Sequence, residues 1–181
     1  NTSGGGGGGG FLQGGSGGAA GLIAVETPGT VSVAGPVLAA GGVATGRHIV
    51  AALAMGAQGV WMGTAWLTTE EYRCHLPDIV FQRLLDAGIE DTVISRADSG
   101  KTLRQIRTAW TDEWESPQAP RPLKMPLQDI LIGDLLGAID EHQIAPLMHS
   151  PAGQSVGYFN AVETVAQRIQ RLLDEAEAAL F

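Results

Sequence analysis

The chain has 181 residues, of which 44% are apolar and 17% charged, and its formal net charge at neutral pH is −8. This length fits about one domain of ~100–200 residues. The acidic balance argues against a nucleic-acid or anionic-membrane surface, because both partners require clustered cations. No run of ~18 apolar residues is present to span a bilayer, and the single cysteine, Cys74, excludes an internal disulfide framework or a zinc site of several thiolates. We therefore expect an acidic cytoplasmic protein with no nucleic-acid or membrane partner.

Glycine is concentrated near the start of the sequence. Twelve of the 26 glycines precede Leu22, and residues 4–10 form an unbroken run. Glycine loses more backbone entropy on ordering than any other residue, so such a run favours neither helix nor strand. Residues 1–10 are therefore interpreted as a low-complexity lead-in.

A strand–helix–strand unit follows. Residues 11–12 form a short apolar start before a glycine loop. Residues 37–40 are continuously apolar, as is typical of a buried strand, and Gly41-Gly42 ends them. Residues 46–55 have apolar positions at helical spacing, with Thr45 as a predicted N-cap and Gly56 after the last turn. Residues 60–62 form a second apolar strand before Gly63-Thr64. This order predicts two parallel, adjacent strands.

Helical patterns dominate after Trp66. Apolar residues recur at helical spacing in residues 77–87, 103–114, 127–140 and 161–180, whereas residues 91–95 indicate a short strand. Four prolines in residues 116–126 predict an extended connector. Trp110 and Trp114, one helical turn apart, are expected to form a core or interdomain stripe.

The two strand ends are the best candidates for a functional site. Glycine lets main-chain N–H groups approach phosphate oxygens without an intervening Cβ, and helix N-termini add partial positive charge. In α/β barrels, the loops after the last two strands often form a phosphate site. Gly41-Gly42 and Gly63-Thr64 are thus interpreted either as a phosphate cradle or as plain tight turns.

Residues 36–47 (PVLAAGGVATGR) and 51–64 (AALAMGAQGVWMGT) resemble the flavin phosphate-binding half of the nitronate monooxygenases, relatives of the flavin-dependent enoyl reductases. Residues 90–107 resemble the small domain of that family, and residues 152–154 its Ala-Gly-Gln segment. The resemblance implies an α/β fold, namely the last strands and helices of a partial TIM (β/α)8-type barrel followed by a mostly helical small domain. Residues 11–68 would be the C-terminal part of the FMN-binding barrel, residues 69–150 the small domain with its connector at 116–126, and residues 151–181 a segment and helix that return to the barrel.

The same resemblance implies which residues bind FMN. They are Gln13, Gly17, Gly41, Gly42, Trp61, Met62, Gly63 and Thr64. No metal is implied. The position of the family's catalytic histidine falls on Ala19, which cannot transfer a proton, so no catalytic residue is predicted.

The implied activity is the FMN-dependent oxidation of nitronates or nitroalkanes by O2. Two alternatives stay open: a catalytically inactive, truncated fragment that acts only through association, and a flavin-dependent enoyl reductase relative. Because an open half-barrel exposes strand edges and apolar faces, a homo-oligomer is also expected.

Overall fold

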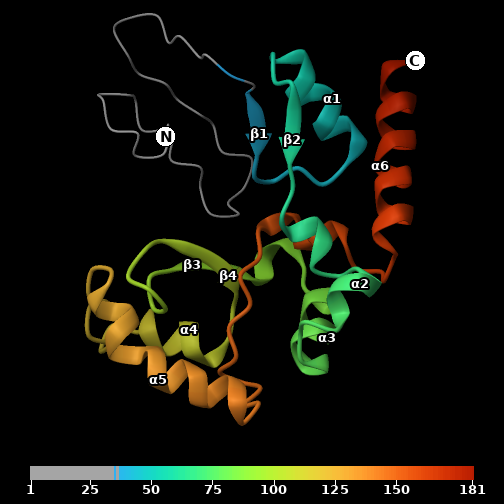
Figure 1. The fold of residues 1–181 in the computed structure, drawn as a ribbon. Coiled ribbons are helices and arrows are strands. Elements are labelled where there is room, and N and C mark those ends of the chain that lie inside the picture. The colour runs from blue at the N-terminus through green and yellow to red at the C-terminus, as the bar shows by residue number, and fades with distance from the viewer. Residues whose placement is uncertain (1–34, 36) are drawn as a thin grey trace, which may run out of the picture.

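The computed structural model of the chain describes Gly35 and residues 37–181. The predicted lead-in at 1–10, the apolar start at 11–12 and the positions Gln13, Gly17 and Ala19 lie outside the described residues. Figure 1 shows strands β1 and β2 beside helices α1 and α6, while α2, α3, β3, β4, α4 and α5 form the remainder.

Strands β1 (Leu38–Ala40) and β2 (Gly59–Trp61) form a parallel pair joined by helix α1 (Gly46–Ala54). The register places Leu38 opposite Gly59 and Ala40 opposite Trp61. The predicted strand–helix–strand unit is therefore confirmed.

The ends of α1 also follow the prediction. The Thr45 side chain accepts a hydrogen bond from the His48 N–H at 3.3 Å, which satisfies one of the free donors at the helix start. Beyond the last turn, Gly56 has a φ of 99°, a backbone conformation that glycine adopts without the Cβ penalty of other residues. The His48 side chain lies on the exposed side of this helix.

The two strands are less buried than their apolar sequence predicted. Leu38 is 47% exposed and Trp61 68% exposed. A strand inside a parallel sheet is normally covered on both faces. Within the described part of the chain this sheet has two strands, so these side chains lack the covering layers that would bury them.

Residues 103–114 do not form the single helix that was predicted. β3 (Thr92–Ser95) pairs antiparallel with β4 (Leu103–Ile106), and the short helix α4 (Ala109–Trp114) follows. The cause is tertiary: the Ile106 N–H donates to the Ser150 carbonyl at 2.9 Å, and the Ala152 N–H donates to the Arg104 carbonyl at 3.2 Å. This distant segment completes the pairing of β4, and helical spacing in the local sequence does not reveal it.

Three further helices agree with the sequence to within a few residues: α3 (Asp78–Asp86), α5 (Leu127–Glu141) and α6 (Val165–Leu180). The structure adds the short helix α2 (Glu70–Arg73), which was not predicted, and the 3-10 turns η1 (Thr64–Trp66), η2 (Ile89–Asp91) and η3 (Gln154–Tyr158). Helix α6 starts later than predicted because the Thr164 side chain caps it, accepting from the Gln167 N–H at 3.1 Å. Residues 116–126 contain neither helix nor strand, as their prolines predicted.

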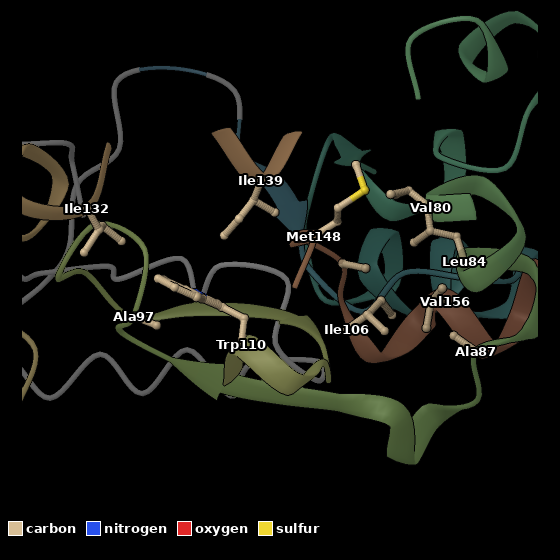
Figure 2. Packing of buried hydrophobic residues seen from close by; sticks show 11 residues of the cluster. Val80, Leu84, Ala87, Ala97, Ile106, Trp110, Ile132, Ile139, Met148 and Val156 are labelled. Atoms are coloured by element: carbon tan, nitrogen blue, oxygen red, sulfur yellow. The ribbon is translucent and has the colours of Figure 1, made fainter. Parts of the chain in front are cut away.

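Two apolar clusters hold these elements together. Figure 2 shows most of the larger cluster, in which Trp110, Ile106 and Met148 connect the hairpin and α5 to α3. Trp114 packs against this cluster, so the predicted tryptophan stripe lies in the core. The smaller cluster contains Ala44, Ala65 and Phe159, which lie next to the ends of β1 and β2. No helix in the described part of the chain is both long and apolar enough to cross a membrane.

Candidate phosphate site at the strand ends

The carboxyl ends of β1 and β2 lie side by side. Ala40 and Trp61, the last residues of the two strands, are register partners, and neighbouring strands are about 4.8 Å apart. The chain therefore leaves both strands at the same edge of the sheet, into Gly41 on one side and Met62 on the other.

The first loop has a backbone that favours glycine. Gly41 has a φ of 86° and Gly42 a φ of 71°, conformations that cost other residues about 1 kcal/mol or more. Among the described residues, Gly35 and 37–181, no group accepts a hydrogen bond from the N–H of Gly41 or of Gly42. These glycines thus combine two unoccupied donors with the absence of a side chain that would cover them.

The second loop offers a further donor of the same kind. Gly63 is exposed, a Cβ added there would meet nothing within 4 Å, and its N–H also lacks a partner among the described residues. Thr64 follows, and its Oγ1 accepts a hydrogen bond from the Gly153 N–H at 2.9 Å. The hydroxyl proton of Thr64 is therefore still available for donation.

Packing against the smaller apolar cluster holds the second loop in place. Met62 and Trp66 pack on the cluster of Ala44, Ala65 and Phe159. The Trp66 Nε1–H donates to the Met62 carbonyl at 2.6 Å, and the Trp66 backbone N–H donates to the Gly63 carbonyl at 3.0 Å. These bonds occupy the carbonyl oxygens of Met62 and Gly63 and hold the backbone of the second loop in place.

A buried arginine, Arg168 on α6, anchors the chain that follows this loop. Its side chain is fully buried. Its guanidinium donates to the Ala65 carbonyl, to Thr68 Oγ1 at 2.8 Å and to the Ala161 carbonyl at 2.8 Å. It also lies 4.9 Å from the centre of the Phe159 ring.

Arg168 was not predicted as an anchor, although the sequence contains a signal for it. Arg168 lies three residues after Val165 and four before Leu172, so helical periodicity places it on the apolar face of α6. A cation on such a face requires buried partners.

Glu163 supplies the negative charge of this network. It pairs with Arg168 Nε at 2.7 Å and with Arg171 Nε at 3.0 Å. Hydrogen bonds from Arg171, and also from Arg168, lower the pKa of the Glu163 carboxyl, although its partial burial acts in the opposite direction.

The start of α1 is occupied by a carboxylate. Glu175 accepts a hydrogen bond from the Gly46 N–H at 2.8 Å and pairs with Arg171 at 2.9 Å. The expected contribution of this helix N-terminus to anion binding is therefore reduced, and the candidate donors are the loop amides.

The structure thus brings five predicted residues to one edge of the sheet: Gly41, Gly42, Met62, Gly63 and Thr64. Trp61 ends β2 at the same edge with an exposed side chain, whereas Gln13 and Gly17 lie outside the described residues. In the part of the chain that the structure describes, no cluster of His, Cys, Asp or Glu could hold a metal ion. The site can offer neutral hydrogen-bond donors to an anion.

Comparison with known proteins identifies the family of the chain. The family model described as nitronate monooxygenase matches residues 2–175. A Mycobacterium tuberculosis protein named as a monooxygenase is 45% identical over 146 residues, which are 77% of this chain and 38% of that protein.

Two solved structures have the same fold over 82% of the chain. FabK from Thermotoga maritima is 31% identical with a TM-score of 0.66, and 46% of its chain is covered. A nitroalkane oxidase from Streptomyces ansochromogenes is 29% identical with a TM-score of 0.68, and 41% of its chain is covered. The chain thus spans less than half the length of these relatives. From the match of the family model over residues 2–175, it belongs to the nitronate monooxygenase family.

Proposed function

We propose that this chain is the C-terminal part of a flavin-dependent oxidoreductase with a partial (β/α)8-type barrel, and that its strand-end loops hold the phosphate of FMN. Membership of the nitronate monooxygenase family supports the oxidoreductase class. The observation that carries the binding site is a set of N–H groups on two adjacent strand ends, those of Gly41, Gly42 and Gly63, which have no partner among the residues that the structure describes.

The residues present fit a phosphate group. Gly41 and Gly42 would donate from the loop after β1, and Gly63 with the Thr64 hydroxyl from the loop after β2. Backbone amides bind phosphate without a cationic side chain, so the site is compatible with a net charge of −8. Trp61 and Met62 complete the proposed set, and Gln13 and Gly17 belong to it by the family resemblance.

The chemistry of the reaction belongs to the cofactor. When bound, FMN accepts electrons from a nitronate or nitroalkane substrate and passes them to O2. The described residues position the cofactor, and the anchor at Arg168 keeps the second loop in place. We assign no proton transfer to this chain, because Ala19 occupies the position of the family's histidine and has no titratable group.

A flavin titration tests this proposal. FMN and riboflavin share the ring system and differ in the phosphate, so the ratio of their dissociation constants isolates the phosphate contribution. Fluorescence titration of the chain should give an FMN affinity at least about tenfold higher than that of riboflavin, equivalent to about 1.4 kcal/mol. Equal affinities would contradict the phosphate site, and an unperturbed flavin spectrum at high protein concentration would contradict flavin binding.

A pair of glycine variants separates binding from backbone strain. Gly42→Ala places a methyl group in the cradle, and we expect it to abolish the preference for FMN. Gly56→Ala imposes a similar strain, since Gly56 also has a positive φ, but a Cβ there meets nothing within 4 Å. Gly56→Ala should therefore lose stability and keep the FMN preference. If both variants lower the preference equally, the loop after β1 has no specific role.

The similarity to FabK keeps the enoyl reductase alternative open. That alternative uses the same phosphate site and differs in substrate. Oxidation of a reduced nicotinamide with an enoyl thioester, without turnover of nitronates, would favour it. A chain that binds FMN and turns over neither substrate would favour the alternative of an inactive fragment.

A further inference from the structure

Helix α5 carries an exposed apolar face. Leu127, Leu131 and Leu135 follow one another at intervals of four residues and are 59%, 64% and 52% exposed, and Ile130 beside them is 73% exposed. The neighbouring side of the helix holds Gln128, Ile132 and Ile139, which are buried, and the two isoleucines belong to the larger core. The exposed stripe is therefore a second apolar face, in addition to the one that attaches α5 to the fold.

The size of this face matches half of a small dimer interface. Leu123 and Met125, just before the helix, are 44% and 49% exposed and extend the stripe. From their exposed fractions, these six side chains present roughly 600 Å², and two copies would bury the roughly 1,200 Å² at which specific interfaces begin. Exposed Asp134 lies beside Ile130 and Leu131 on this face, and an apolar area of this size is at the upper end of the patches found on monomers.

The position of α5 argues against a barrel strand as its cover. Figure 1 shows α5 at the opposite end of the molecule from β1 and β2. Further strands of that parallel sheet would join it beside β1 or β2, because strands extend a sheet along its edges. The α5 face is therefore remote from the place where the sheet would grow.

Charges at the two ends of α5 are complementary. Arg121 and Lys124 precede the helix, while Asp140 and Glu141 end it, and all four are exposed. Among the described residues none of them is in an ion pair. An antiparallel copy of the helix would place the basic end of one chain beside the acidic end of the other, and it would also oppose the two helix dipoles.

We propose that α5 pairs with α5 of a second copy of this chain, antiparallel, about a two-fold axis near Leu131. In this arrangement Leu127 faces Leu135 of the partner subunit, and the stripe of every fourth residue forms the ridge that packs between the two helices. The interface is isologous, so one substitution changes both halves.

Sedimentation equilibrium of the full chain tests the pairing. The unmodified chain should be a dimer at micromolar concentration, and Leu131→Glu should raise the dissociation constant more than about tenfold, because it buries two unpaired carboxylates at the centre. Leu173→Glu on α6, where Leu173 is 55% exposed, is the matched control and should leave the dimer intact. High salt should weaken the dimer a few-fold through the end charges.

A cross-linking variant gives a positive signal that does not depend on loss of association. In a Cys74→Ser background, Leu131→Cys should form an intermolecular disulfide under mild oxidation, since residues beside a two-fold axis approach within about 6 Å. Leu173→Cys should not. A monomer up to about 100 µM would overturn the proposal, as would a dimer that Leu173→Glu dissociates and Leu131→Glu leaves unchanged.

Discussion

Arg168 shows how a single residue can order a loop that it does not belong to. Its bonds to the Ala65 carbonyl and to Thr68 link α6 to the chain just after the proposed phosphate loop. Burial of a guanidinium is tolerated only when its donors are satisfied. Here Glu163 supplies the charge and backbone carbonyls supply most of the remaining acceptors.

Removal of the Glu163 charge should destabilise the fold in a pH-dependent way. The folded state lowers the pKa of Glu163, so its stabilisation is complete above the unfolded pKa of about 4.3 and is lost as the pH falls through the lower folded value. Glu163→Gln should lower the free energy of unfolding at pH 7 by about 1–3 kcal/mol, and this difference should shrink toward pH 3. Urea unfolding at both pH values measures it.

Glu177→Gln provides the control for this experiment. Glu177 is exposed on the same helix, so its variant should change the free energy of unfolding by less than about 0.5 kcal/mol at either pH. A Glu163→Gln deficit that stays constant from pH 7 to pH 3 would show that the carboxylate charge does not stabilise the network.

At the scale of elements, the contact between α1 and α6 depends on Gly46. A Cβ at this position would lie 2.5 Å from the Leu172 carbonyl oxygen and would also collide with the backbone at Glu175 and Ala176. Two helix backbones that approach so closely leave no room for a side chain. Helix α6 therefore packs against the N-terminal end of α1, which follows the loop at Gly41 and Gly42.

Two glycine-to-alanine variants in helices should therefore have opposite effects. Gly46→Ala should destabilise the chain by about 3 kcal/mol through overpacking. Gly133→Ala on α5, where a Cβ meets nothing within 4 Å, should stabilise it by about 0.5–1 kcal/mol through helix propensity. Denaturant unfolding of both variants gives the two signs. A neutral Gly46→Ala would mean that the helices are not in this close contact.

The elements that the sequence predicted are those with local signals. Gly41-Gly42, the Thr45 cap and Gly56 delimit the strand–helix–strand unit within a short stretch of chain. Residues 103–106 gave the wrong element because Leu103 and Ile106 have helical spacing, whereas the strand depends on pairing with Thr92–Ser95 and with the segment at Ser150. Non-local pairing of this kind leaves no periodic trace in the strand itself.

The same distinction between local and distant signals applies to the candidate site. The glycines at the strand ends could be proposed from the sequence because glycine adopts backbone conformations that other residues rarely adopt. Glu175 at the start of α1 could not, because its contact with Gly46 joins residues 129 positions apart in the sequence.

At the scale of the whole molecule, the sheet of β1 and β2 lies at one end and the exposed apolar helix α5 at the other (Figure 1). Apolar side chains are exposed at both ends of the described part of the chain, among them Leu38 and Trp61 at the sheet and Leu131 on α5. At the sheet end, our proposal places the phosphate of FMN at the loops that follow β1 and β2. At α5, a second copy fits the size and charge of the surface.

Amide NMR of the ¹⁵N-labelled chain tests the central claim most directly. Addition of FMN should shift the N–H resonances of Gly41, Gly42 and Gly63 downfield as they donate to the phosphate, whereas riboflavin should leave them in place. The Gly56 amide already donates to the Leu53 carbonyl at 2.9 Å and should not move with either ligand. If FMN and riboflavin produce the same shifts, or if the three glycine amides stay unchanged when FMN binds, the strand ends do not hold the phosphate.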